Sequence, residues 1–140
     1  MNILFFITPK NNVCCVEDTY SLRQTIEKME YHRYTAVPML NVHGIYIGTI
    51  TEGDLLRVIK DKLDLNLRGS EDIKTYEIPR RWNYESININ CDIEDLFELA
   101  SKQNFVPVVD DDGVFIGLIK RSDIIEYFYK HGAKTAGQGE

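Results

Sequence analysis

The pattern of apolar and polar positions repeats in the two halves of the chain. Residues 35–40 (TAVPML) correspond to residues 104–109 (NFVPVV), so Pro38 aligns with Pro107. The same alignment, without gaps, pairs Gly44 with Gly113, Gly48 with Gly117 and Asp54 with Asp123. A repeat of this kind predicts two copies of one supersecondary unit that together bury a core.

A stripe of apolar positions, three and four residues apart, precedes each proline-containing segment. In the first half the stripe comprises Leu22, Thr25, Ile26 and Met29, and Asp18 or Thr19 precedes it as the helix start. In the second half it comprises Ile93, Leu96, Phe97 and Ala100, and Asp92 precedes it. The first half carries two extra residues between this stripe and the proline segment. The spacing predicts an amphipathic helix in each half.

Strands are predicted on both sides of these helices. Nearly continuous apolar runs at residues 45–50 and 114–119 are typical of strands that are covered on both faces. Short strands at residues 13–16 and 86–89 complete each unit. The predicted fold is therefore α/β (α+β), with the order β-α-β-β-α occurring twice.

The repeat also predicts the domain organisation. We expect the first repeat at residues 8–66, a charged connection at 67–83, the second repeat at 84–131 and a flexible polar tail at 132–140. Neither half is expected to be stable alone, because a unit of about 60 residues buries too little surface.

The net charge of the chain argues against some classes of binding partner. Sixteen Lys and Arg residues against 22 Asp and Glu residues give a net charge of −6, which argues against binding to nucleic acid or anionic lipid. The apolar start at residues 3–7 is far shorter than the roughly 20 residues of a membrane span, and no basic leader precedes it. We expect a cytoplasmic protein.

Catalytic and metal-binding motifs are not evident. Three cysteines, two of them adjacent at Cys14 and Cys15, predict reduced and buried thiols rather than a disulfide framework. None of the three histidines has zinc-ligand spacing to a cysteine, so no metal site is expected. The chain has no Walker loop, nucleophile elbow or HExxH motif, and we therefore expect no enzymatic activity.

One motif recurs where the second strand of each half runs into a helix. It is GTITEGDL at residues 48–55 and GLIKRSDI at residues 117–124. The plain interpretation is helix capping, with Thr51 as the N-cap and Asp54 in the first turn. The alternative is a ligand site, because unpaired N–H groups at a helix start suit phosphate and a carboxylate accepts hydrogen bonds from hydroxyls.

The duplicated motif, with its proline strand and glycine turn, resembles the cystathionine-β-synthase (CBS) domain over about residues 10–130. Two such domains in tandem resemble a Bateman module with pseudo-two-fold symmetry. The resemblance implies paired clefts between the repeats, adenine nucleotides or other adenosyl compounds as regulatory ligands, no catalytic cofactor, a protein effector, and a homodimer built from helix faces.

By position, the resemblance implies that Asp54 and Asp123 bind ribose hydroxyls as mostly exposed acceptors, and that Thr51 contacts ribose or phosphate. Lys120 stands where the family usually has Ser or Thr. With Arg121 it either favours a phosphate group or forms a solvated surface pair.

Adenine is expected against the first strand of a repeat and against the residues that enter the proline strand. These residues are Val13, Cys14, Tyr34, Thr35 and Ala36 in the first half and Ile87, Asn88, Asn104 and Phe105 in the second, with Pro38, Gly48, Pro107 and Gly117 completing the predicted sites. Tyr34 and Phe105 either stack on a base or pack in the core. Arg80 and Arg81 either reach a phosphate or are solvated.

The favoured hypothesis is an adenine-nucleotide sensor of the AMP, ADP or ATP type, in which ligand binding changes the conformation that a partner detects. A cyclic di-AMP receptor and a ligand-free dimerisation scaffold are the alternatives. The sequence does not choose among AMP, ADP, ATP, S-adenosylmethionine and cyclic di-AMP, because all of them share the adenosine half.

Overall fold

The computed structural model describes residues 2–64 and 66–139, with side chains as far as His131. The elements of the first repeat are β2 (Val16–Glu17), α1 (Leu22–His32), β3 (Ala36–Leu40), β4 (Tyr46–Thr51) and α2 (Glu52–Lys62). Those of the second are β5 (Ile87–Asn88), α3 (Ile93–Ala100), β6 (Phe105–Val109), β7 (Phe115–Lys120) and α4 (Arg121–Gly139). The predicted order of elements is confirmed. The tail predicted at 132–140 lies outside the residues whose side chains are described.

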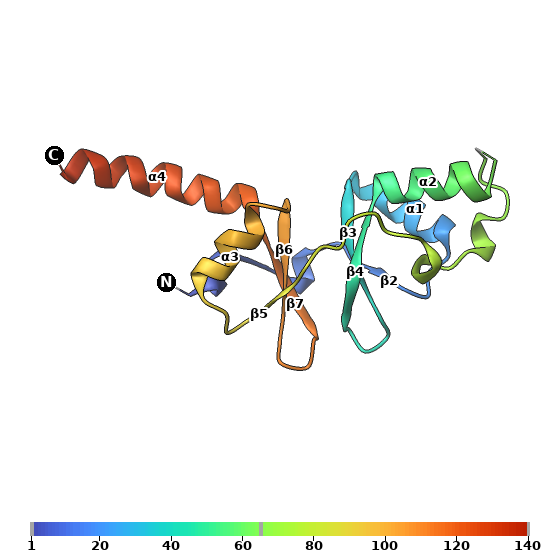
Figure 1. Cartoon of the computed structure of the whole chain (residues 1–140), viewed down its shortest axis with the longest axis horizontal. Helices are drawn as coiled ribbons and strands as arrows, with labels where there is room; N and C mark the ends of the chain where they lie inside the picture. Colours follow the sequence, from blue (N-terminus) through green and yellow to red (C-terminus); the bar gives the residue numbers. More distant parts are fainter. Residues whose placement is uncertain (1, 65, 140) are drawn as a thin grey trace.

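Two sheets meet in the middle of the molecule, and the helices lie on their outer sides (Figure 1). The first sheet has the order β2-β3-β4 and the second the order β1-β7-β6-β5. Strand β1 (Ile7–Pro9) comes before the first repeat but pairs antiparallel with β7 of the second. The sequence analysis assigned residues from 8 onward to the first repeat, because a strand of three residues has too few positions to show a period.

Helix α1 begins later than the sequence analysis expected. Its N-cap is Ser21, not Asp18 or Thr19. The Ser21 hydroxyl accepts from the Gln24 N–H at 3.1 Å, and the Gln24 side chain accepts from the Ser21 N–H at 2.8 Å. This capping box satisfies two N–H groups at the helix start, which explains why the helix begins there.

A shared core and a backbone bridge join the two repeats. The Tyr46 N–H donates to the Gly113 carbonyl at 3.1 Å, and the Phe115 N–H donates to the Gly44 carbonyl at 2.9 Å. The rings of Tyr46 and Phe115, which are equivalent in the repeat, stack with centroids 6.3 Å apart. The Tyr46 hydroxyl also donates to the Tyr84 carbonyl, and burial raises the pKa of Tyr46 to about 12.

The connection between the repeats folds back onto the first repeat. Its 3₁₀ helices are η3 (Ser70–Asp72) and η4 (Thr75–Glu77), after η1 (Ile3–Phe6) and η2 (Lys10–Asn12) near the N-terminus. The buried hydroxyls of Thr25 and Thr75 are 2.7 Å apart, and Ile78 belongs to the core of the first repeat. The connection is therefore part of the packed structure.

Gly48 and Gly117 are equivalent in the repeat, but a side chain at each position would meet different neighbours. A Cβ atom at Gly117 would clash with the carbonyl oxygen of Thr8 in β1, whereas one at Gly48 would meet the guanidinium end of Arg80. Backbone in a paired strand moves less readily than the end of a long side chain. We expect Gly117→Ala to lower the free energy of unfolding by about 1–3 kcal/mol, and Gly48→Ala by less than about 1 kcal/mol, in urea denaturation. Equal losses would contradict this role of β1.

Candidate functional site

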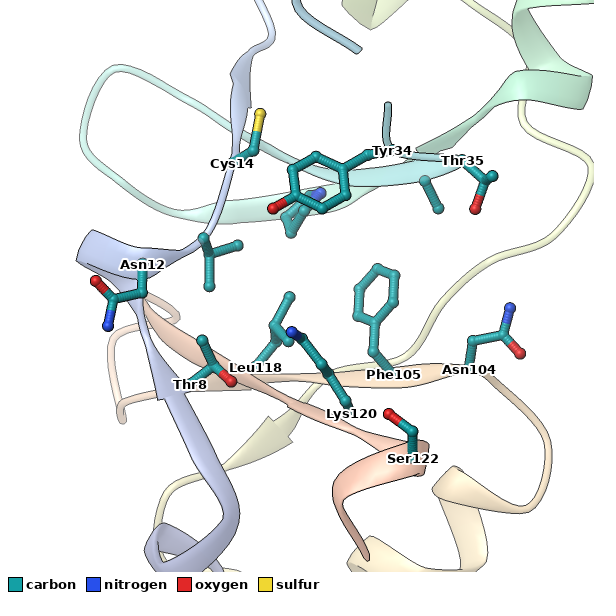
Figure 2. A pocket seen from close by; sticks show the side chains of 13 residues that line it. Thr8, Asn12, Cys14, Tyr34, Thr35, Asn104, Phe105, Leu118, Lys120 and Ser122 are labelled. Atoms are coloured by element: carbon teal, nitrogen blue, oxygen red, sulfur yellow. The ribbon is translucent and has the colours of Figure 1, made fainter. Parts of the chain in front are cut away.

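A pocket with a volume of about 260 Å³ lies between the two repeats (Figure 2). It is lined by Thr8 and Asn12 near the N-terminus, by Val13, Cys14, Tyr34, Thr35, Ala36 and Pro38 of the first repeat, and by Asn104, Phe105, Leu118, Lys120 and Ser122 of the second. The sequence analysis assigned its two groups of residues to separate repeats, and the fold brings members of both groups together in this one pocket.

Two aromatic side chains extend into the pocket from opposite walls (Figure 2). Tyr34 is 45% exposed and precedes β3. Phe105, in β6, is 9% exposed and lies 5.0 Å from the Tyr84 ring. The packing interpretation of Phe105 is thus confirmed, although the ring also forms part of the pocket wall. Tyr34 is less buried. Its ring stacks on the His32 ring, with centroids 5.9 Å apart, and the face that lines the pocket is available to stack on a flat group.

Lys120 carries the only charge among the described residues that line this pocket, and its side chain extends into it (Figure 2). An ammonium group in a pocket without carboxylates favours an anionic group such as phosphate. The neighbouring Arg121 is directed elsewhere: its Nε donates to the Ala100 carbonyl at 2.6 Å, at the end of α3. Arg121 therefore matches neither predicted role, because it binds protein backbone and does not line the pocket.

The backbone at Cys14 offers both a donor and an acceptor. Among the described residues, no hydrogen bond reaches the N–H or the carbonyl of Cys14. Strands β2 and β3 are parallel with Val16 opposite Met39, so the ladder would next use the N–H of residue 38 for the Cys14 carbonyl. Pro38 has no N–H, which leaves that carbonyl without a strand partner.

The thiols of Cys14 and Cys15 are not activated as nucleophiles. All three cysteines are free, but each is only half-buried, so the expectation of buried thiols is wrong. Burial raises the pKa of Cys14, and it raises the pKa of Cys15 to about 11. Both thiols are therefore protonated at neutral pH and poor nucleophiles.

The motif of the first repeat is a complete helix cap. The Thr51 hydroxyl accepts from the Asp54 N–H at 3.2 Å, and the Asp54 carboxylate accepts from the Thr51 N–H at 3.0 Å. The same carboxylate accepts from the Arg81 N–H at 3.2 Å and from the guanidinium of Arg57. Asp54 is 2% exposed, so the expectation of a mostly exposed acceptor is wrong, and the capping interpretation is confirmed.

The motif of the second repeat differs because Lys120 has no hydroxyl to accept from the N–H of Asp123. Asp123 is half-buried and lines a neighbouring groove that shares Thr8 with the pocket. Ser122, between Arg121 and Asp123 in sequence, lines the pocket itself. The Lys side chain thus stands where the equivalent Thr51 caps its helix.

A second cleft lies at the equivalent place on the other side. It is lined by Thr51, Trp82, Asn83, Tyr84, Glu85, Leu99, Lys102, Gln103 and Asn104. When the alignment that pairs α1 with α3 is extended upstream, the counterparts of Val13 and Cys14 are Tyr84 and Glu85, and not Ile87 and Asn88 as predicted.

The predicted pair in the second repeat has structural roles instead. Ile87 is buried in the core, and the Asn88 amide donates to Asp111 at 2.8 Å. The prediction failed because it aligned the first strands out of register.

The two arginines of the connection take structural positions. Arg80 lies over Gly48, and its guanidinium donates to the Ile47 carbonyl at 3.2 Å. Arg81 binds Asp54 through its backbone N–H. Neither residue lines the pocket or the second cleft.

Sequence reasoning missed four residues that line the pocket: Thr8, Asn12, Leu118 and Ser122. A signal for Thr8 was present, because the alignment that pairs the two helices also pairs Ile7 with Ile78. Extending the repeat upstream in that alignment would have included β1.

The contrast between the two aspartates is testable by stability. We expect Asp54→Ala to lower the free energy of unfolding by about 2–3 kcal/mol, because it removes a helix cap, leaves the part-buried N–H groups of Thr51 and Arg81 without an acceptor and creates a cavity at a buried position. Asp123→Ala is the matched control and should change it by less than about 0.5 kcal/mol. Chemical denaturation of both variants measures the difference, and a neutral Asp54→Ala would contradict the burial described above.

Two further observations limit the kinds of site. Within the described residues, no group of three or more His, Cys, Asp or Glu side chains is placed to hold a metal ion. No helix in the same part of the chain is both long and apolar enough to span a bilayer.

Comparison with known proteins agrees with this architecture. The chain is 32% identical over 129 residues to an uncharacterized protein of Methanocaldococcus jannaschii, a match that covers 89% of the chain but 29% of that relative. A crystal structure of CbpB in complex with c-di-AMP has a TM-score of 0.86 at 19% identity, covering 99% of this chain and 91% of that one. A structure of CBSX2 in complex with AMP has a TM-score of 0.72 at 20% identity, covering 94% and 98%.

The CBS domain model matches residues 7–61 and 75–130, and both matches correspond to the repeats seen in the fold. The chain therefore belongs to the CBS domain family and contains two CBS domains in tandem.

Proposed function

We propose that the chain is a regulatory module that binds an adenosine-containing ligand in the pocket between its repeats. The observation that carries this proposal is the combination of an unpaired backbone edge at Cys14, an exposed aromatic ring at Tyr34 and a single cation at Lys120 in one pocket.

Each of these groups suits one part of a nucleotide. The Watson–Crick edge of adenine presents an acceptor beside an amino donor, which complements an N–H beside a carbonyl. Tyr34 offers a face on which the base can stack. Lys120 is the group that would hold a phosphate. Asp123 lines the neighbouring groove, which shares Thr8 with the pocket, and it remains our candidate for binding the ribose.

Two neighbours in fold support an adenosine ligand, since CbpB is seen with c-di-AMP and CBSX2 with AMP. One cation in the pocket favours a ligand with a single phosphate, and we propose AMP as the first candidate. Cyclic di-AMP is the second, because CbpB has the same fold.

The pocket spans both repeats, so a bound ligand stabilises one arrangement of the two. We infer that a protein effector detects this arrangement. The high pKa of Cys15 and the raised pKa of Cys14 keep both thiols protonated, which supports a module that does not use them as nucleophiles. We also propose that the module is regulatory rather than catalytic and acts in the cytoplasm.

Ligand binding is tested by a thermal-shift screen against AMP, ADP, ATP, S-adenosylmethionine and cyclic di-AMP, with guanosine nucleotides as controls. Ligand at 100 times its dissociation constant should add about 2.7 kcal/mol of stability. Tyr34→Ala should weaken both adenosine and AMP about tenfold, whereas Lys120→Ala should weaken AMP about tenfold and spare adenosine.

Lys102→Ala is the matched control for Lys120, because Lys102 lines the second cleft. It should leave AMP affinity unchanged in calorimetry. Equal shifts with guanosine and adenosine nucleotides, or none with either, would overturn the proposed function.

We also propose that a second copy of the chain covers the outer helix faces. A groove between α1 and α2 is lined by Ile26, Met29, Glu30, Arg33, Tyr34, Glu52 and Leu55, and one between α3 and α4 by Phe97, Ala100, Ser101, Arg121, Ile124, Ile125 and Phe128. The two grooves are equivalent in the repeat. Glu30 and Glu52 outweigh Arg33 in the first groove, whereas Arg121 makes the second positive. This difference in charge supports a dimer in which the first groove of one chain meets the second groove of its partner.

Light scattering after size-exclusion chromatography should therefore give the mass of a dimer. Phe128→Glu, at a position 44% exposed on α4, should give a monomer because it buries an unpaired charge in the interface. Val42→Glu, 79% exposed in a hairpin turn, is the control and should stay dimeric. A monomeric wild-type chain contradicts the arrangement.

A further inference from the structure

The second cleft contains a side chain that occupies its backbone edge. The Gln103 carbonyl oxygen accepts from the Glu85 N–H at 3.1 Å. Its amide nitrogen donates to the Glu85 carbonyl at 2.8 Å and to the Phe105 carbonyl at 3.0 Å. All three bonds are made by one planar amide group, and they close the gap between the segment before β5 and the start of β6.

The repeat identifies the corresponding groups in the first pocket. Glu85 corresponds to Cys14 in the alignment of the helices, and Phe105 corresponds to Ala36 in the alignment of the proline strands. The N–H and carbonyl of Cys14 have no partner among the described residues. The residue equivalent to Gln103 is Tyr34, whose phenol has no amide to bridge them. The same backbone edge is thus open in one pocket and occupied in the other.

Proline explains why this edge needs a partner. Strands β5 and β6 are parallel with Ile87 opposite Val108, so the ladder would next require the N–H of residue 107 for the Glu85 carbonyl. Pro107 has none, as Pro38 has none in the first repeat. An unpaired carbonyl away from water is costly, and Gln103 removes that cost in the second cleft.

The chemistry of the bound amide matches that of a nucleobase. A primary amide presents an acceptor oxygen beside an NH₂ donor, which is the pattern on the Watson–Crick edge of adenine. We propose that Gln103 is an internal substitute for adenine: it occupies the backbone edge that a base would bind, and so keeps nucleotides from the second cleft, which is itself open with a volume of about 510 Å³. The chain then binds one nucleotide, in the pocket that contains Tyr34. This inference rests on the proposed function of that pocket.

Two other features of the second cleft agree with its exclusion of nucleotides. The Asp54 carboxylate, counterpart of Asp123, is buried and already accepts from Thr51, Arg57 and Arg81. Glu85 adds a negative charge where the first pocket has the neutral Cys14, and its repulsion of a phosphate offsets the attraction of Lys102, which lines the same cleft and lies 3.7 Å from Glu98.

The test is an adenosine titration followed by the backbone amide signals of Cys14 and Glu85 in ¹⁵N NMR spectra. Adenosine is chosen because it carries no phosphate for Glu85 to repel. In the wild-type chain we expect the Cys14 signal to shift and the Glu85 signal to remain unchanged at saturation. A saturable shift at Glu85 would overturn the inference, whereas no shift at either residue would overturn the proposed function.

Two reciprocal variants test the role of Gln103 itself. Gln103→Ala should expose the Glu85 edge, so that adenosine now shifts the Glu85 amide as well. Tyr34→Gln should place the same amide in the first pocket and weaken adenosine there by about tenfold more than Tyr34→Ala does, since both variants lose the ring but only the glutamine competes for those hydrogen bonds. Lys102→Ala, beside Gln103, is the control and should leave Glu85 silent.

The outcomes separate clearly. If the amide signals of Gln103→Ala show that the variant is folded, but adenosine does not shift the Glu85 signal, the inference is overturned. If that variant does not fold, the comparison of Tyr34→Gln with Tyr34→Ala decides, because equal adenosine affinities in the two variants would show that a glutamine at this position does not compete with a nucleobase.

Discussion

The contact between the two hairpins determines everything else that the chain presents to a ligand. The exchange of backbone hydrogen bonds between Tyr46 and Gly113, and between Phe115 and Gly44, fixes the two sheets about a pseudo-two-fold axis. Tyr46 adds a stacked ring and a bond to the Tyr84 carbonyl, so the start of the second repeat is held against the first. Because the sheets cannot slide past each other, residues from opposite halves of the sequence form one pocket.

A proline in the central strand of each repeat leaves a backbone carbonyl of the neighbouring strand without a hydrogen-bond donor. Pro38 and Pro107 are buried and lie beside a parallel strand, where any other residue would donate to the neighbouring carbonyl. Each proline leaves an acceptor at the edge of a cleft between the repeats. In the first pocket this acceptor and the N–H of Cys14 form a donor and acceptor pair that a planar ligand can reach.

The sequence predicted the elements that a repeating apolar pattern marks, but it did not predict features that depend on one or two specific contacts. Apolar spacing and the alignment of the two halves were sufficient for the element order, and the resemblance to the CBS domain supplied most of the pocket wall, including Tyr34 and Lys120. Apolar spacing did not predict strand β1, since three residues show no period and its partner β7 is far along the chain; only the alignment of the helices, extended upstream, reaches it. The burial of Asp54 was missed because the capping motif does not reveal that Arg57 and Arg81 also bind the carboxylate.

The departures from repeat symmetry are more informative than the symmetry. Thr51 and Asp54 satisfy each other, and the helix they begin has no need of a ligand. Lys120 cannot cap its helix in that way, and its charge instead enters the pocket that Tyr34 leaves open. Gln103 replaces Tyr34 on the other side and uses the edge that a base would need. The repeat provides two equivalent clefts. These few side chains make one of them a binding pocket, whereas in the other Gln103 holds two backbone segments together.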